Sequence, residues 1–163
     1  MANFIFQEKQ RFRQIWLWTI LLGVGVIVIV AIVLELKNGE SVWEGLIPLG
    51  IIALVFVLIA RMELTTRIDE QSLSFKFFPF IIERKYSFEK LTSIELIEYN
   101  GLLEYGGWGI KWNVDSWSYT IGGRFGILVK TGSKKFLIGT QIPEEAKKAI
   151  KQFNEFKAQS YGS

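Results

Sequence analysis

The feature that most constrains the fold of this chain is a run of 20 residues, from Ile15 to Leu34, without a charged side chain. A helix rises about 1.5 Å per residue, so the run matches the roughly 30 Å hydrocarbon core of a bilayer. Strands rarely exceed about 10 residues, which argues against one long buried strand. The run therefore predicts a transmembrane helix over residues 15–34. A secretory signal is the alternative, but the apolar region of a signal spans only about 7–15 residues.

A second apolar run covers 15 residues, from Leu46 to Ala60. That length is compatible with a membrane helix or with a buried core helix. Trp43 before the run and Arg61 after it suit the two interfaces of a bilayer, and a first span lies just upstream. The pattern favours a second transmembrane helix over residues 46–61, with residues 35–45 as the loop between the spans.

The distribution of Lys and Arg predicts the orientation of this hairpin. The loop carries Lys37 alone, together with three glutamates. The other basic residues near the spans are Lys9, Arg11, Arg13, Arg61, Arg67 and Lys76. By the positive-inside rule we expect a multi-pass protein of the plasma (inner) membrane. Residues 1–14 and the C-terminus would be cytoplasmic, and the loop would lie outside.

From residue 62 onward the apolar residues recur with period two, as Leu73, Phe75 and Phe77 do. Such alternation predicts half-buried strands. The strands expected before the last hairpin cover residues 64–68, 73–78, 81–88, 91–99, 108–112 and 117–121. An amphipathic helix follows Pro143, with an apolar stripe at Ala146, Ala149, Ile150 and Phe153. We expect a cytoplasmic domain over residues 62–157 and a flexible tail over residues 158–163.

Two hairpins have a predicted register. In "WGIKWNVDSWSYTI" the expected pairs are Trp112 with Trp117, Ile110 with Tyr119, and Trp108 with Ile121. In "FGILVKTGSKKFLIG" a type II′ turn at Gly132-Ser133 would pair Val129 with Phe136, Ile127 with Ile138, and Lys130 with Lys135. These hairpins and the final helix indicate a mainly antiparallel α+β domain.

The chain also resembles a known family. The two-span hairpin followed by "LTTRIDEQSLSFKFFPF", "GGWGIKW", "YTIGGRFGILV" and "FLIGTQIPEE" is similar to small bacterial membrane proteins of unknown function that carry a pleckstrin-homology-like (PH-like) domain. The resemblance covers residues 15 to about 155. It implies a membrane α-helical hairpin followed by a PH-like barrel with a C-terminal helix, and it implies no activity.

The composition argues against several classes of function. The chain has no Cys and no His, which removes thiol chemistry, zinc-thiolate sites and the usual general base. A net charge of +3 without a basic stripe argues against nucleic-acid binding. Glu95, Glu98 and Glu104 leave a two-carboxylate enzyme as an unsupported alternative. We therefore predict no catalytic residue, no metal and no cofactor.

Two groups of residues are candidates for binding. Lys130, Lys134 and Lys135 cluster at one hairpin tip, where anionic lipid headgroups would attract them by about 1 kcal/mol each. Arg84 and Lys85 could add to that patch, and an ordinary solvated turn is the alternative. Trp108, Trp112 and Trp117 are candidates for partner binding. The alternative there is structural, with the neighbouring glycines bending the sheet.

The leading hypothesis is an integral membrane protein that presents a non-catalytic cytoplasmic module for protein or membrane-surface binding. Its partners would be the lipid bilayer, with anionic headgroups as one target. The alternative is an accessory subunit whose spans bind another membrane protein or a second copy, because Gly23, Gly25 and Gly50 permit close helix approach. A membrane-bound enzyme with a carboxylate site is the third hypothesis.

Overall fold

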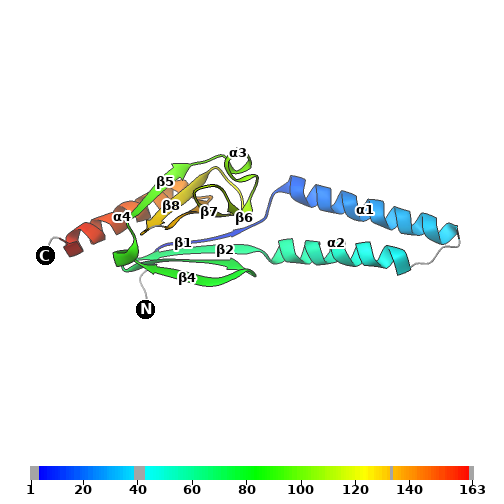
Figure 1. The fold of residues 1–163 in the computed structure, drawn as a ribbon, viewed down its shortest axis with the longest axis horizontal. Helices are drawn as coiled ribbons and strands as arrows, with labels where there is room; N and C mark the ends of the chain where they lie inside the picture. The colour runs from blue at the N-terminus through cyan, green and yellow to red at the C-terminus, as the bar shows by residue number, and fades with distance from the viewer. Residues whose placement is uncertain (1–3, 39–42, 133, 162–163) are drawn as a thin grey trace. The chain divides into compact units, whose positions relative to one another are not determined.

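The computed structural model describes residues 4–38, 43–132 and 134–161. The chain forms two compact units, one made of residues 12–62 and the other of residues 1–11 together with residues 63–163 (Figure 1). The second unit is therefore discontinuous in sequence. The first unit is inserted between two of its strands.

The inserted unit is a hairpin of two apolar helices, α1 (Ile15–Lys37) and α2 (Trp43–Arg61). The helices pack antiparallel: Trp18 contacts Phe56 edge-on at 5.1 Å between ring centroids, and the backbone of Gly45 lies against Ile32. No residue of α1 is buried. Among the described helices, α1 is the one that is long and apolar enough to cross a membrane, and the apolar part of α2 covers the shorter range Gly45–Arg61.

Both helices are longer than expected. α1 continues three residues past Leu34, and α2 begins at Trp43 instead of residue 46. Polar and charged residues at the helix ends do not enter the apolar runs, so apolar length alone underestimates these helices. Residues 39–42 of the expected loop lie outside the described residues.

The first sheet of the domain has four antiparallel strands in consecutive order, β1 (Phe4–Arg11), β2 (Glu63–Asp69), β3 (Ser72–Phe78) and β4 (Ile81–Ser87). β1 lies beside β2 from Phe6–Ile68 to Arg11–Glu63, although the helical hairpin separates them in sequence (Figure 1). This differs from the expectation that residues 1–14 form a segment outside the domain. β1 lacks the apolar alternation that identifies a strand in a sequence, because its buried face includes the polar residues Glu8 and Gln10.

β1 is fastened at both of its faces. On the exposed face, Arg11 forms an ion pair with Glu63 at 2.7 Å, and the Arg11 hydrogen bond lowers the pKa of the Glu63 carboxyl. On the buried face, Gln10 Nε2 donates to the Gly139 carbonyl at 2.6 Å. Glu8 accepts hydrogen bonds from the Thr140 hydroxyl at 2.7 Å and from the Gln141 backbone N–H at 2.8 Å. β1 therefore joins the first sheet to the end of the second.

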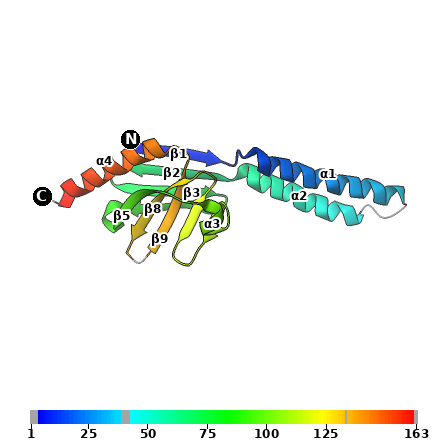
Figure 2. The ribbon, with the colours of Figure 1, turned by 90° about the horizontal axis from the view of Figure 1, so that it is seen from above.

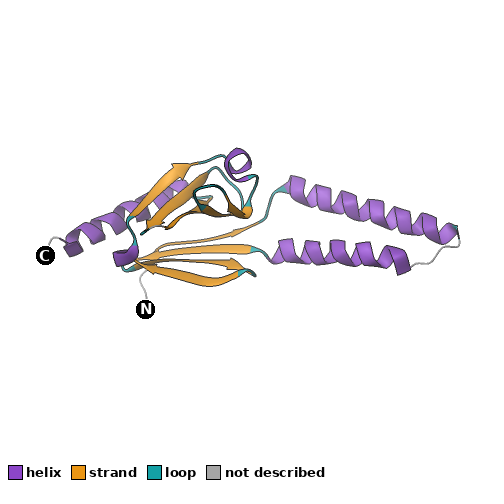
Figure 3. Ribbon diagram, viewed as in Figure 1, coloured by secondary structure: helices purple, strands orange, loops and turns teal. Residues whose placement is uncertain are grey.

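The second sheet has five strands in the order β5-β8-β9-β7-β6. They are β5 (Ser93–Glu98), β6 (Gly109–Trp112), β7 (Trp117–Thr120), β8 (Phe125–Thr131) and β9 (Lys134–Thr140). Figure 3 shows the strands of the domain in orange. The predicted register of β8 with β9 is confirmed, and Gly132 has φ of 54° at their turn. Ser133, the other expected turn residue, lies outside the described residues.

The architecture is α+β, and the expected barrel is not closed. No pairing between described residues joins the two sheets, and β7 pairs with β9 in parallel. The sheets instead pack through their side chains: Phe75 of β3 contacts Tyr119 of β7 at 4.7 Å and Phe136 of β9 at 5.6 Å. Short helical segments, η1 (Phe88–Lys90) and α3 (Gly101–Tyr105), flank β5.

The C-terminal helix α4 (Pro143–Tyr161) packs along β5 and β1, close to the N-terminal strand (Figure 2). Its predicted apolar stripe is confirmed, since Ala146, Ala149, Ile150 and Phe153 are all buried. The helix continues to Tyr161, so it includes residues that we expected in the flexible tail. Lys157 Nζ donates to the Leu91 carbonyl, which holds this last part of α4 beside the sheet.

Candidate functional site

The domain has a cleft of about 580 Å³ between β4 of the first sheet and the β6–β7–β9 side of the second. It lies where the two sheets are not joined by strand pairing. Most lining residues are aromatic or basic. They are Phe80, Ile81, Arg84, Tyr86, Ile110, Trp112, Asp115, Ser116, Trp117, Tyr119, Lys134, Lys135 and Phe136.

The base of the cleft is an aromatic cluster continuous with the core. Tyr86 contacts Phe136 at 5.0 Å between ring centroids, and Tyr119, which is 3% exposed, packs on Phe75. Burial raises the pKa of the Tyr119 phenol, so the hydroxyl stays neutral at physiological pH. The cluster therefore provides a rigid apolar floor with one buried hydroxyl.

Arg84 is anchored to that floor from the exposed strand β4. Its Nη1 donates to the Tyr119 hydroxyl at 2.9 Å, and its guanidinium carbon lies 5.8 Å from the centroid of the Tyr119 ring. Within the described residues Arg84 makes no ion pair with a carboxylate. A guanidinium has five N–H donors, so most of them are available to an anion in the cleft.

The wall of the cleft on the second sheet is a pair of tryptophans. Trp112 of β6 is paired with Trp117 of β7, and their rings meet edge-on at 5.7 Å. Trp112 is 50% exposed and Trp117 is 48% exposed. Asn113 shapes the turn between them, because its Oδ1 accepts from the backbone N–H groups of Asp115 and Ser116.

The aromatic side chains of Trp112, Trp117 and Tyr119 form a row, called here the aromatic ladder, that runs from solvent to the core. The predicted pairs Trp112–Trp117 and Ile110–Tyr119 are confirmed. Because Trp117 and Tyr119 alternate on one face of β7, the ladder begins at two half-exposed tryptophans and ends at the buried phenol. Large aromatic surfaces exposed in a cleft are typical of binding sites.

Trp108 does not belong to this cleft. The strand register ends at Gly109–Thr120, so the expected pair of Trp108 with Ile121 lies beyond the strand. Trp108 instead packs on Gly101 of α3, where a Cβ would lie 3.0 Å from the indole Nε1. The indole donates to the Gly123 carbonyl at 3.4 Å.

The glycines on either side of Trp108 lie at the end of helix α3 and at the start of strand β6. Asn100 accepts hydrogen bonds at the start of α3, and Gly106, with φ of 66°, ends that helix in the left-handed conformation. Gly107 and Gly109 also have positive φ, at 126° and 115°. The structural interpretation of this stretch is therefore supported, with a helix C-cap in place of a bent sheet.

The three candidate lysines do not form one patch. Lys134 shares a face of β9 with Phe136, which points toward the first sheet. Lys135 is paired with Lys130 across the hairpin, yet it also lines the cleft, whereas Lys130 does not. Lys130 Nζ lies 4.0 Å from Glu95. The structure thus places Lys134 and Lys135 at the cleft with Arg84 and leaves Lys130 outside it.

The carboxylates considered for catalysis are engaged elsewhere. Glu95 lies beside Lys130, Glu98 forms an ion pair with Arg124 at 2.5 Å, and Glu104 accepts from the Asn100 backbone N–H at 2.8 Å. No group of three His, Cys, Asp or Glu residues that could hold a metal ion occurs in the described part of the chain. Asp115 is the one acidic residue that lines the cleft.

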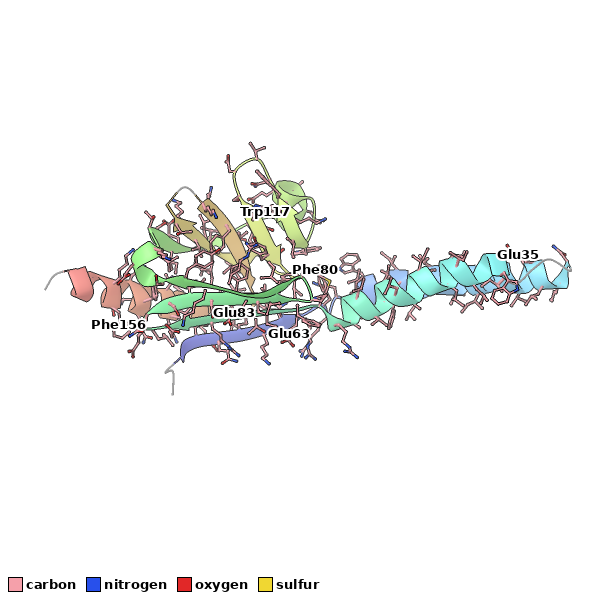
Figure 4. All side chains as sticks on the ribbon, turned by 60° about the horizontal axis from the view of Figure 1, so that its bottom comes forward. Glu35, Glu63, Phe80, Glu83, Trp117 and Phe156 are labelled. Atoms are coloured by element: carbon pink, nitrogen blue, oxygen red, sulfur yellow. The ribbon has the colours of Figure 1, made fainter. Side chains whose placement is uncertain are left out.

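Sequence reasoning located the tryptophans and Lys134 but missed Tyr86 and Phe80. Tyr86 belongs to β4 and Phe80 to the turn before it, and only the packing of one sheet on the other brings them to the cleft that Trp117 also lines. Figure 4 labels Phe80 and Trp117. Together the cleft offers three cationic residues, Arg84, Lys134 and Lys135, with exposed aromatic faces and one carboxylate, which suit an anionic group attached to an apolar body. No family model, curated protein or solved structure matches the chain.

Proposed function

We propose that this chain is a non-catalytic binding module held at the cytoplasmic face of the plasma membrane by a hairpin of two transmembrane helices. One observation carries the anchoring: Arg11 and Glu63, which flank the hairpin in sequence, are paired in one sheet. If α1 crosses the bilayer, the chain has to cross back before β2 begins. The apolar helix α2 is the segment available for that return.

The dimensions of α2 agree with this role. Its apolar part, Gly45–Arg61, spans about 26 Å, which is near the lower end of the lengths that cross a hydrocarbon core of roughly 30 Å. Trp16 at the start of α1 and Trp43 at the start of α2 are both exposed, as interfacial tryptophans would be. A cleaved signal is disfavoured, because cleavage after α1 would remove β1 together with the buried Glu8 and Gln10.

The orientation follows from the basic residues on the domain side of the hairpin. A reporter that is active only in the cytoplasm should be active when fused before Met1 or after Ser163. The same reporter inserted after Asn38, in the proposed external loop, should be inactive. Export of either terminal reporter would contradict the proposed topology.

We assign the domain to the PH-like class as part of this proposal. Support comes from two packed sheets of mainly antiparallel strands followed by a C-terminal helix. The parallel β7–β9 pair departs from a simple succession of hairpins.

The ligand that fits the cleft best is the phosphate of an anionic lipid headgroup. Arg84, Lys134 and Lys135 supply the charge. Trp112 and Trp117 supply apolar surface for the adjoining glycerol and acyl carbons. Phe80 and Ile81 also line the cleft, and they follow the end of β3 that is paired with Glu63, just after α2. The cleft therefore lies within chain reach of the membrane surface.

Titration of the full-length protein in detergent with a short-chain phosphatidylglycerol tests this assignment. Tryptophan fluorescence should change on binding and lose that change in Trp117→Phe. The double variant Arg84→Glu/Lys134→Glu should weaken binding at least tenfold, since charge-assisted hydrogen bonds contribute about 1.5–3 kcal/mol each. Lys148→Glu, an equal charge change on exposed α4, should leave binding unchanged. A response to inorganic phosphate alone would indicate a soluble anion, and no response to either would contradict the proposal.

A second candidate, an accessory subunit of a membrane complex or homo-oligomer, is favoured by one observation. A Cβ atom added at Gly23, Gly25 or Gly50 would have no neighbour within 4 Å, so the packing of α1 on α2 does not require glycine at these positions. Their free surfaces permit a further helix to approach closely. Stoichiometric co-purification of one membrane protein, or a stable dimer, would favour this candidate.

A further inference from the structure

The turn between β3 and β4 is apolar and exposed. Phe78 ends β3, Phe80 lies in the turn, and Ile82 belongs to β4; their side chains are 44%, 59% and 85% exposed. Three large apolar side chains in five residues are unusual on a surface that faces only water. Figure 4 labels Phe80 at this end of the first sheet.

The strand register places this turn at the end of the sheet where the chain leaves α2. Phe78 is paired with Glu63, and only Met62 separates Glu63 from Arg61, the last residue of α2. Two residues reach at most about 7 Å, and paired Cα atoms lie about 5 Å apart. Chain connectivity alone therefore keeps Phe78 within about 12 Å of the end of α2.

Lysines lie on both strands that form the turn, and one exposed glutamate, Glu83, follows Ile82. Lys76 is exposed, and its Nζ lies 5.8 Å from the centroid of the Phe78 ring. Lys85 on β4 is also exposed. Aromatic side chains bordered by lysines are typical of segments that bury apolar groups at the headgroup boundary and keep cations among the phosphates.

We propose that Phe78, Phe80 and Ile82 insert into the interfacial region of the bilayer and form a third attachment of the domain to the membrane. The inference rests on the proposed membrane hairpin, because α2 fixes the level of the lipid surface. The headgroup region adds about 5–8 Å on each side of the hydrocarbon core, which the turn can reach from the end of α2. The third attachment would restrict rotation of the domain about its two covalent tethers.

The chain has no cysteine, so single labelling sites need no prior substitutions. Four full-length variants, each carrying an environment-sensitive NBD fluorophore, are reconstituted in zwitterionic phosphatidylcholine nanodiscs with nitroxide-labelled lipids. Phe80→Cys and Ile82→Cys report on the turn. Both side chains are exposed, so these substitutions should not disturb folding. Val26→Cys reports on the middle of α1. Gln71→Cys is the matched control, because it lies at the opposite end of the same strand pair, about 20 Å along β2.

The expected result is quenching of the label at residue 80 and at residue 82 by nitroxides near the headgroups, and of the label at residue 26 by nitroxides deep in the acyl chains. The label at residue 71 should keep its intensity. Quenching at residue 26 without quenching at residues 80 and 82 would overturn the insertion and leave the hairpin intact. Equal quenching at residues 71, 80 and 82 would overturn it too, since the contact would not be specific to the turn. Absence of quenching at residue 26 would overturn the membrane hairpin and, with it, this inference.

Discussion

At the scale of single residues, Glu8 is the position whose chemistry is least expected from its sequence context. Its carboxylate is buried between the sheets and accepts hydrogen bonds from Thr140 and Gln141. Desolvation nevertheless outweighs these bonds, and the pKa of Glu8 is raised above 4.5. The folded protein thus binds a proton at Glu8 more tightly than the unfolded chain does.

This shift predicts a pH-dependent effect of Glu8→Gln. The amide keeps an acceptor for the Gln141 N–H but carries no charge. Well below the ordinary pKa of a glutamate, Glu8 is protonated in both the folded and the unfolded wild-type chain, so its ionisation has no cost there. As the pH rises through the raised pKa of Glu8, the wild-type domain should lose free energy of unfolding relative to the variant. Denaturant unfolding of both proteins at several pH values measures this difference, and a difference that stays constant with pH would refute the ionisation argument.

Sequence patterns predicted the Trp112–Trp117 pair correctly, but they did not predict the surroundings of Trp108 or of Arg84. The exposed tryptophan pair follows from hairpin register, which is local and was predicted correctly. Trp108 lies outside the ladder because Gly109, the first residue of β6, has a positive φ. The alternation of side chains along β6 therefore does not extend back to Trp108. The contact of Arg84 with Tyr119 joins different sheets, and no periodicity within either strand encodes it.

At the scale of elements, α4 is the part of the domain that the sequence predicts best. Its apolar spacing identified all four buried positions, because helical period and burial coincide when one face meets a sheet. β1 was missed for the opposite reason. Its buried face is made of Phe6, Glu8 and Gln10, whose polar side chains are compensated by partners on β9 and after it. The alternation of apolar and polar residues likewise could not decide whether the barrel closes. It identifies the buried face of each strand but not which strands of two sheets pair with each other.

Two phenylalanines of α4 provide a test of this packing. Phe153 is buried at 1% exposure, and Phe156 is exposed. Phe153→Ala should lower the free energy of unfolding by about 3–5 kcal/mol, because it removes a ring from a closely packed site. Phe156→Ala, the same change one turn later, should cost far less. Equal losses in denaturant unfolding would contradict the assignment of the packed face.

At the scale of the whole molecule, the central fact is that the helical hairpin is an insertion between two paired strands. Removing residues 1–62 would therefore not release an intact domain. It would uncover the edge of β2 and leave the Gly139 carbonyl and the Thr140 hydroxyl without their partners on β1. Exposed strand edges promote aggregation.

The same register predicts how a soluble domain can be made. Because Arg11 is paired with Glu63, residues 12–62 should be replaceable by a two-residue Asn-Gly turn. The shortened chain is expected to be monomeric in water and to unfold cooperatively, whereas a chain that begins at Glu63 should aggregate. Size-exclusion chromatography and circular dichroism compare the two. A folded, monomeric product from the chain lacking β1 would contradict the role assigned to this strand.

The insertion also has a consequence for biosynthesis. β1 is synthesised before its partner strand β2, which follows only after residues 12–62 have been made, roughly 3–10 s later at about 5–20 residues per second. During that interval the nascent β1 has no sheet to join. The helical hairpin is synthesised before any other strand of the domain. If the hairpin enters the bilayer as we propose, it can do so before the first sheet is complete, and the domain then completes its folding with both neighbouring strands already tethered to the membrane.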